Sequence, residues 1–267
     1  MLVFIIPVKN KKISRSWDLL SKLFERCLKS LCNQTSPNFR VVVVCNEKPD
    51  TQFDHPHIHY VNVDFPPPIS ESDEPENSTG YAYGQSQKIN KQNADKARRI
   101  AKGLEYAERF NPSYFMVVDA DDCVNRHLSE FVEQHQDVDG WLLKKGYVYR
   151  EGSKLLWLNR KTFNEVCGTS LIMKYSWRNA LFPRPDFYNH LFKQIPGANV
   201  KQLPFVGAIY SIGNGENIYM GSHTQTAIKK QVFQGGILVF LQKALKYRLS
   251  WLTKSLINDF SLYTVSG

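Results

Sequence analysis

The chain has 267 residues, 42% hydrophobic and 13% aromatic, which is enough to fill one large domain or one domain with an appendage. Its five cysteines are scattered without a Cys-x-x-Cys pair, which argues against a disulfide framework or thiolate metal motif and predicts reduced, cytoplasmic thiols. The net charge of +9 comes without a zinc-finger or RNA-binding signature, so we expect an anionic small ligand and no nucleic-acid partner. The apolar run at the N-terminus is too short for a signal peptide, and no run has the length of a membrane span.

The first half of the chain predicts an α/β unit. Leu2–Val8 and Phe39–Cys45 are apolar runs typical of buried strands, and Trp17–Leu31 carries apolar residues at helical spacing. Strand, helix and strand in this order predict a parallel sheet. A short third strand, His57–Val63, is followed by Asp64–Gly80, an acidic segment that we interpret either as a solvated linker or as a lid over a site.

A cluster of carboxylates follows the predicted central strand. Tyr114–Val118 is apolar, and Asp119, Asp121 and Asp122 come directly after it. In open α/β sheets, ligands bind beyond the carboxyl ends of the strands. Three neighbouring carboxylates resist desolvation unless a cation lies among them, and oxygen ligands suit Mg²⁺ or Mn²⁺. The alternative is a solvated, Asp-rich turn that caps the next helix.

A basic helix with a small-residue face, from Ile89 to Leu104, precedes this strand and can lie close to the sheet. The elements expected after it are a helix at Val124–Gln136, a hairpin between Gly140–Arg150 and Lys154–Arg160, a turn at Glu165–Ser170 leading into a strand, a helix beginning near Asp186, and a strand at Gln202–Ile212. The glycine-rich loop at 213–217 lacks the spacing of the nucleotide-binding glycine motifs and is interpreted as a plain turn.

The tail, Lys230–Phe260, has apolar residues interleaved with lysines and is predicted to be helical. The sequence thus divides into a domain at 1–225 and a C-terminal helical appendage at 226–267. Between Gly221 and Gly267 six cations stand against one acid, a charge of +5. We expect this amphipathic helix either to pack on the body or on a second subunit as a homodimer, or to lie on an anionic membrane as a peripheral anchor at its inner face.

The order of these features resembles the GT-A fold glycosyltransferases, and most closely the large inverting family 2. In that family the first strand typically ends in Pro-x-x-Asn, as Pro7–Asn10 does here, and the fourth ends in an Asp-x-Asp motif, as Asp119–Asp121 does. The resemblance covers about residues 2–190. It implies a Rossmann-like, mixed and mainly parallel sheet with flanking helices, and a nucleotide-sugar donor over the carboxyl ends of its strands.

The resemblance also implies roles for individual residues of the donor site. Residues expected to contact the donor are Pro7, Val8, Lys9 and Asn10 in the nucleoside pocket, Asn46 and Glu47 in place of the usual acidic pair, Lys96 and Arg99 as cations, Asp119 and Ala120 beside the ribose, and Gly168 and Thr169 in the turn near the sugar. Asp121, with Asp119, would hold Mn²⁺ or Mg²⁺. His223 would complete the metal shell, and its alternative interpretation is a lone surface histidine.

An inverting enzyme also needs a carboxylate that accepts the proton of the acceptor hydroxyl, and the resemblance implies Asp186 first and Glu165 second. We therefore expect a metal-dependent glycosyltransferase that moves a sugar from a nucleoside diphosphate sugar, here a UDP-sugar, to a saccharide or lipid-linked acceptor in surface polysaccharide synthesis. Two alternatives stay open. A nucleotidyltransferase is disfavoured because the loop after the first strand contains no glycine, and a non-catalytic nucleotide-sugar-binding protein would keep the same fold.

Overall fold

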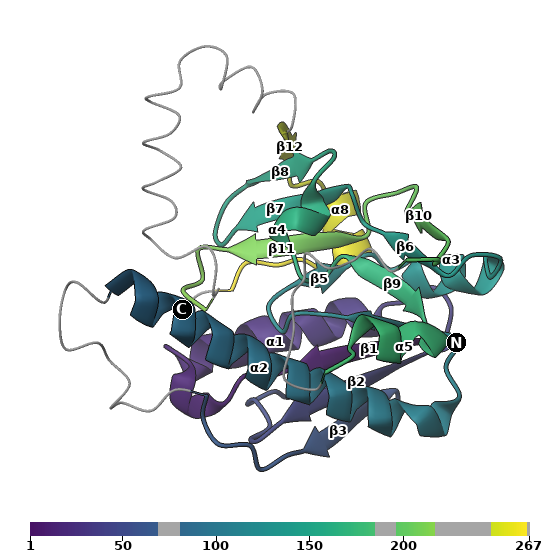
Figure 1. Ribbon diagram of the computed structural model, residues 1–267. Helices are drawn as coiled ribbons and strands as arrows, with labels where there is room; N and C mark the ends of the chain where they lie inside the picture. Colours follow the sequence, from purple (N-terminus) through teal and green to yellow (C-terminus); the bar gives the residue numbers. More distant parts are fainter. Residues whose placement is uncertain (69–80, 185–195, 217–246, 266–267) are drawn as a thin grey trace.

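Two mixed β-sheets form the frame of the protein (Figure 1). The structure is a computed structural model, and the residues that it describes are 1–68, 81–184, 196–216 and 247–265. The first sheet has seven strands, in the order β10 (Val200–Gln202), β6 (Gly140–Leu142), β9 (Leu171–Lys174), β4 (Tyr114–Val117), β1 (Leu2–Pro7), β2 (Phe39–Cys45) and β3 (Ile58–Asn62). Four of its six pairings are parallel, which confirms the predicted mixed, mainly parallel sheet.

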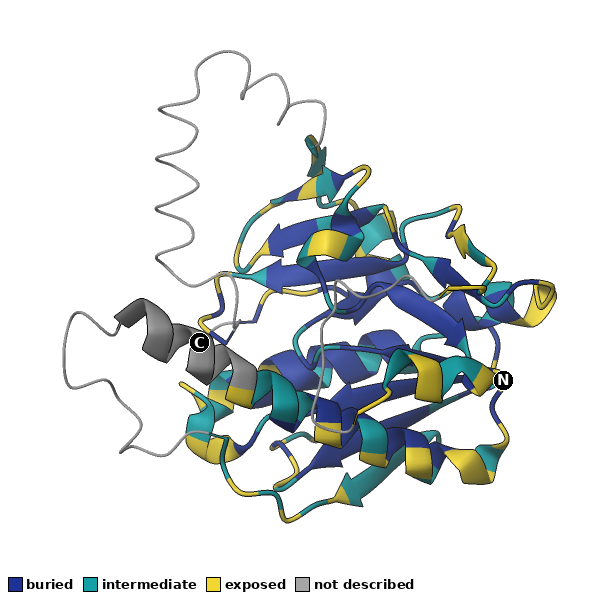
Figure 2. Cartoon of the chain, in the orientation of Figure 1, coloured by how far each residue is buried: buried dark blue, intermediate teal, exposed yellow. Residues whose placement is uncertain are grey.

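Helices cover both faces of this sheet, which is why β1 and β2 are apolar at almost every position (Figure 2). Helix α1 (Trp17–Cys32) packs on one face, where its Phe24 and Leu28 join the same core as Phe4 of β1. Helix α2 (Tyr81–Ala107) packs on the other face through Ile100 and Leu104.

Helix α2 lies very close to β1, as its small-residue face predicts. A Cβ added at Gly103 would stand only 2.6 Å from a methyl carbon of Ile5, so a larger residue at this position would push the helix from the sheet. The close approach brings the polar side chains of α2 to the edge of the sheet.

The second sheet has five strands, in the order β12 (Tyr247–Trp251), β8 (Leu155–Asn159), β7 (Gly146–Arg150), β11 (Ala208–Ile212) and β5 (Cys123–Val124). One face joins the core beneath α1 through Val148 and Tyr210. The other face packs against α8 (Lys254–Phe260), where Phe260 is buried beside Tyr149 and Leu156. The remaining short helices are α3 (Leu128–Gln134), α4 (Phe163–Val166) and α5 (Arg178–Leu181).

The C-terminal segment corrects part of the prediction that Lys230–Phe260 is helical. Tyr247–Trp251 is a strand that pairs antiparallel with β8, and a helix, α8, follows from Lys254. The apolar residues in this segment fit the spacing of a helix and also that of a strand. Pairing with β8, about 90 residues earlier, decides in favour of the strand. Residues 230–246, and the predicted boundary at 226, lie outside the described residues.

Two other predicted elements are divided between the sheets. Gly140–Arg150 contains β6 in the first sheet and β7 in the second, so the predicted hairpin consists of β7 and β8 alone. The predicted strand Gln202–Ile212 contains only the last residue of β10 and, after a break at 203–207, all of β11. None of the helices in the described part of the chain is long and apolar enough to span a bilayer.

Candidate functional site

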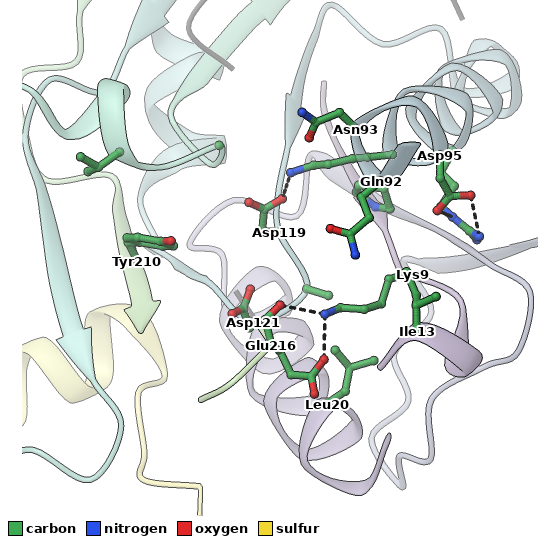
Figure 3. Close-up of a pocket in the computed structure, with 16 residues that line it drawn as sticks. Lys9, Ile13, Leu20, Gln92, Asn93, Asp95, Asp119, Asp121, Tyr210 and Glu216 are labelled. Atoms are coloured by element: carbon green, nitrogen blue, oxygen red, sulfur yellow. Dashed lines mark hydrogen bonds and ion pairs between the residues drawn. The ribbon is translucent and has the colours of Figure 1, made fainter. Parts of the chain in front are cut away.

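A cavity lies beyond the carboxyl ends of β1 and β4, where the sequence predicts a ligand site (Figure 3). Pro7 and Lys9 contribute from the end of β1, and Asp119 to Asp121 from the end of β4. Helix α2 supplies polar side chains from Gln92 to Arg99. These groups meet because β1 and β4 are parallel neighbours and end at the same edge of the sheet.

Asp119 and Lys96 are in direct contact at the wall of this cavity. The Lys96 ammonium forms an ion pair with Asp119 Oδ1, and the Asp119 carboxylate is about one quarter exposed. The backbone N–H of Asp119 donates to Thr169 Oγ1 at 2.9 Å. Thr169 therefore anchors the backbone of Asp119, while the Asp119 carboxylate faces the cavity.

Asp121 lies in a more enclosed environment. Its Oδ2 accepts a hydrogen bond of 2.7 Å from the Asn214 amide. Burial, and next the neighbouring charge of Asp119, raise the pKa of Asp121 above its ordinary value. A cation placed between these two carboxylates would favour the charged form of Asp121 and so oppose both effects.

Asp122 points away from the cavity into the interior. Its Oδ2 accepts from Thr169 Oγ1 at 2.6 Å, and its Oδ1 accepts from the backbone N–H of Ser211 at 3.1 Å. Burial, followed by the charges of Asp121 and Asp119, raises its pKa well above the ordinary range. Asp122 thus joins the turn after β4 to strand β11, and it has no access to a ligand.

Lys9 is held by a carboxylate that the sequence analysis did not identify. Its Nζ donates to Glu216 Oε2 at 2.7 Å and to the Glu216 carbonyl at 2.8 Å. Glu216 also accepts from Ser14 Oγ at 3.2 Å and from the backbone N–H of Ser16 at 2.9 Å. These bonds fix the Lys9 ammonium at the cavity wall beside Asp121 (Figure 3).

Arg99 is buried at the other side of the cavity. Asp95 accepts two hydrogen bonds from its guanidinium, at 2.8 and 3.1 Å, and Asn46 Oδ1 accepts a third at 2.7 Å. The amide of Asn46 donates in turn to the carbonyl of Phe65, and so does the amide of Asn10. Arg99 Nη1 is buried and has no hydrogen-bond partner among the described residues, although Arg99 lines the cavity.

The structure brings eight of the sequence-predicted residues to the cavity wall: Pro7, Lys9, Lys96, Arg99, Asp119, Ala120, Asp121 and Gly168. Six others are elsewhere. Val8 is buried in the core, Thr169 lies beneath the carboxylates, Asn10 and Asn46 hold the carbonyl of Phe65, and Glu47 and Glu165 are exposed outside the cavity. Asp186 and His223 lie outside the described residues.

The loop at 213–217, interpreted from sequence as a plain turn, contributes more than expected. Gly213 and Gly215 have φ of 78° and 80°, a conformation that glycine adopts without strain. They turn the backbone so that Asn214 reaches Asp121 and Glu216 reaches Lys9. In the sequence, only the alternation of glycines with polar residues indicates such a role. The residues that Asn214 and Glu216 contact are more than 90 residues away along the chain.

Asp119 and Asp121 are the residues that could hold a metal ion. Within the described ranges, no three His, Cys, Asp or Glu side chains converge on one metal position. Mg²⁺ commonly uses only one or two protein carboxylates and completes its shell with water and substrate phosphates. The pair therefore fits a divalent cation that is bound together with a diphosphate.

No family model and no curated protein matches the chain. Among solved structures it is similar to S. aureus TarS 1-349, at 13% identity and a TM-score of 0.46, over 79% of this chain and 60% of that chain. The complex of TarS 1-349 with UDP gives 14% identity and 0.44, over 80% and 61%. The bifunctional IspDF from Campylobacter jejuni gives 13% and 0.36, over 79% and 49%. The chain spans about three fifths of TarS 1-349, and likenesses this distant assign neither residues nor activity.

Proposed function

We propose that the protein is a metal-dependent glycosyltransferase of the GT-A type that uses a nucleoside diphosphate sugar, namely a UDP-sugar. The observation that carries the proposal is the charge pattern of the cavity at the carboxyl ends of β1 and β4. Asp119 and Asp121 face cations from two separate elements, Lys9 after β1 and Lys96 on α2. A diphosphate with a divalent cation has both kinds of charge that such a wall can bind.

The balance of charge in the cavity supports a requirement for metal. Among its described lining residues, three cations stand against the four carboxylates of Asp95, Asp119, Asp121 and Glu216, which leaves a formal charge of −1. A diphosphate alone would meet net repulsion there. A divalent ion reverses the sign of the wall, so the donor and the metal are expected to bind together.

The residues of the chain then have distinct tasks. Lys9 and Arg99 are oriented by the carboxylates that they contact and would pair with phosphate oxygens. Asp121 and Asp119 would hold Mn²⁺ or Mg²⁺, which when bound supplies Lewis-acid neutralisation of the leaving diphosphate. Ile13 and Leu20 give the cavity an apolar wall beside Lys9, which suits the rings of the donor.

The acceptor is proposed to be the hydroxyl of a saccharide or lipid-linked saccharide. Its proton requires a carboxylate, and Asp186 remains the first candidate and Glu165 the second. Glu216 is less suited to this task because both of its oxygens already accept hydrogen bonds. His223 remains a candidate third metal ligand.

Thermal denaturation with UDP and Mn²⁺ tests the donor site. We expect the two together to raise the Tm of the wild type by several degrees, because ligand at 100 times its Kd stabilises a protein by about 2.7 kcal/mol. UDP without metal should give a much smaller shift. Asp121→Asn should abolish the joint shift, since the amide keeps the shape but loses the charge.

Asp18→Asn is the matched control, because Asp18 is 74% exposed on α1 and pairs only with Lys22 in the described structure. An equal shift in Asp121→Asn and wild type would refute the assignment. Release of UDP from a panel of UDP-sugars then tests transfer. Asp186→Asn and Glu165→Gln should retain the joint Tm shift, and the variant that loses transfer identifies the base.

A further inference from the structure

The outer edge of the second sheet presents large apolar side chains to solvent. Trp157 of β8 is 49% exposed, and Leu249 and Trp251 of β12 are 47% and 71% exposed. Trp157 lies directly opposite Leu249, and Trp251 lies opposite Leu155. Residues paired in this way point to the same side of a sheet, so Leu155, Trp157, Leu249 and Trp251 form one surface, here called the outer face.

Packing among the described residues does not account for the outer face. The opposite side of β8 packs against α8, and Leu156 is fully buried there in the same cluster as Phe260. A strand pair with one covered side normally carries polar residues on the other. Contiguous exposed apolar side chains mark an interaction surface instead.

Only cations flank this surface in the two strands that build it. The stretches 154–161 and 247–254 contain five cations and no acid, and all five are exposed: Lys154, Arg160, Lys161, Arg248 and Lys254. Arg248 is paired with Leu158, so its side chain begins on the other side of the edge strand β12. Glu165 of α4 acts electrostatically on Tyr247, at the far end of β12 from Trp251. The partner of the outer face should therefore be apolar in part and anionic in part.

The outer face is continuous with the cavity. Tyr210 of β11 lines the cavity, and it pairs with Val148 of β7, which pairs with Trp157, which pairs with Leu249. This row of four side chains runs along one side of the sheet from the cavity to its edge. Figure 1 places β8 and β12 at the end of the molecule opposite β3.

We propose that the outer face docks on the anionic surface of a lipid bilayer. Tryptophan is enriched at the membrane–water interface, where its ring contacts the acyl boundary and its N–H contacts the headgroups. Exposed Lys and Arg beside it bind anionic headgroups. Leu249, with no polar atom in its side chain, gains only from an apolar environment.

Other occupants fit these residues less well. A second copy paired across a two-fold axis would bring the same five cations toward each other. A neutral saccharide could contact the tryptophan rings but has no negative charge for the cations to bind. If the proposed glycosyltransferase function holds, membrane docking would bring the cavity near a lipid-linked acceptor; the docking itself does not depend on that function.

Co-sedimentation of the full chain with vesicles tests the proposal. We expect binding to vesicles of phosphatidylcholine with phosphatidylglycerol and much weaker binding to phosphatidylcholine alone. Leu249→Thr/Trp251→Thr should weaken binding at least about tenfold, since it removes two apolar anchors and keeps residues that favour strands. Arg248→Ser/Lys254→Ser should weaken binding to the anionic vesicles, as should added salt.

Ile257→Thr is the matched control because Ile257 is 37% exposed on α8, away from the outer face, and should leave binding unchanged. The proposal fails if the wild type does not bind, if Leu249→Thr/Trp251→Thr binds as the wild type does, or if Ile257→Thr weakens binding equally. Should the double variant not fold, quenching of tryptophan fluorescence by brominated lipid decides. Quenching must occur in the wild type and fall clearly in Trp251→Phe; equal quenching in both overturns the proposal.

Discussion

The hydroxyl of Thr169 contacts two of the three aspartates in the turn after β4, Asp119 and Asp122. It donates to Asp122 Oδ2 at 2.6 Å and accepts from the backbone N–H of Asp119 at 2.9 Å, with its side chain fully buried. One hydroxyl thus satisfies a buried carboxylate and anchors the backbone of a carboxylate that faces the cavity. Because the three acids follow one another in sequence, only such contacts give them different roles.

Thr169→Val tests these contacts. Valine has nearly the same shape but leaves the backbone N–H of Asp119 without this acceptor and leaves Asp122 Oδ2 with only the weak donor Cys167 Sγ, at 3.3 Å. We therefore expect a loss of about 2 to 4 kcal/mol in the free energy of unfolding. Urea denaturation measures it. Thr169→Ser retains the hydroxyl and should lose less than half as much. Thr51→Val, which removes a half-buried hydroxyl that contacts Glu25, should have a smaller effect; comparable losses in the two valine variants would contradict the role of Thr169.

Strand β3 is an edge element whose stability should depend on pH. The ring of His59 contacts the rings of Tyr106 and Phe110 in tilted geometry, and its Nε2 is buried without a hydrogen-bond partner among the described residues. Burial, and next the charge of Arg40, lower the pKa of His59 below its ordinary 6.5. Between the folded and unfolded pKa the unfolded chain binds more protons, so the folded state loses stability as pH falls below 6.5.

His59→Phe removes the titrating ring and retains the aromatic contact with Phe110, which has a centroid separation of 4.6 Å in the wild type. We expect the free energy of unfolding of the variant, relative to wild type, to rise as the pH is lowered from 7.5 to 5. Denaturation at a series of pH values gives this difference. A difference that is constant with pH would show that His59 titrates alike in the folded and unfolded chains.

Elements with a simple local pattern could be predicted from sequence, and elements defined by distant pairing could not. Strands β1, β2 and β4 are buried on both sides and read as unbroken apolar runs, and α1 has its apolar residues on one side. Strand β12 was missed because its pairing with β8 leaves no trace in the residues around it.

The same limit applies to the site. Asp119 and Asp121 could be identified because the end of a central strand is recognisable from its own residues. Glu216 could not, since the Lys9 that gives it a role is 207 residues away. Asn10 and Asn46, which are expected at the donor, both donate to the carbonyl of Phe65, a contact that depends on where the chain returns after β3.

At the scale of the whole molecule, Arg26 connects parts of the chain that are otherwise separate. It lies on α1 with no exposed side-chain surface, and its guanidinium donates to Glu151 at 3.1 Å, to Ser211 Oγ at 3.1 Å and to the Tyr263 carbonyl at 2.7 Å. Glu151 in turn accepts from the backbone N–H of Val265 at 2.8 Å. The helix beneath the first sheet, the second sheet and the C-terminal segment thus share one buried ion pair.

Arg26→Met should therefore destabilise the whole molecule. It leaves the Glu151 carboxylate largely buried without its cation, and losing one partner of a buried pair costs about 3 to 5 kcal/mol. We also expect the residues after Tyr247 to become the first site of proteolysis, because the Tyr263 carbonyl loses its donor. Lys22→Met, which breaks the exposed pair with Asp18, should cost less than about 1 kcal/mol.

A double variant tests whether the ion pair is responsible. Arg26→Met/Glu151→Gln should lose less free energy of unfolding than the sum of the losses of the two single variants, because no buried charge is then left alone. Additive losses would mean that the contacts of Arg26 with Ser211 and Tyr263, rather than the ion pair, connect the two sheets.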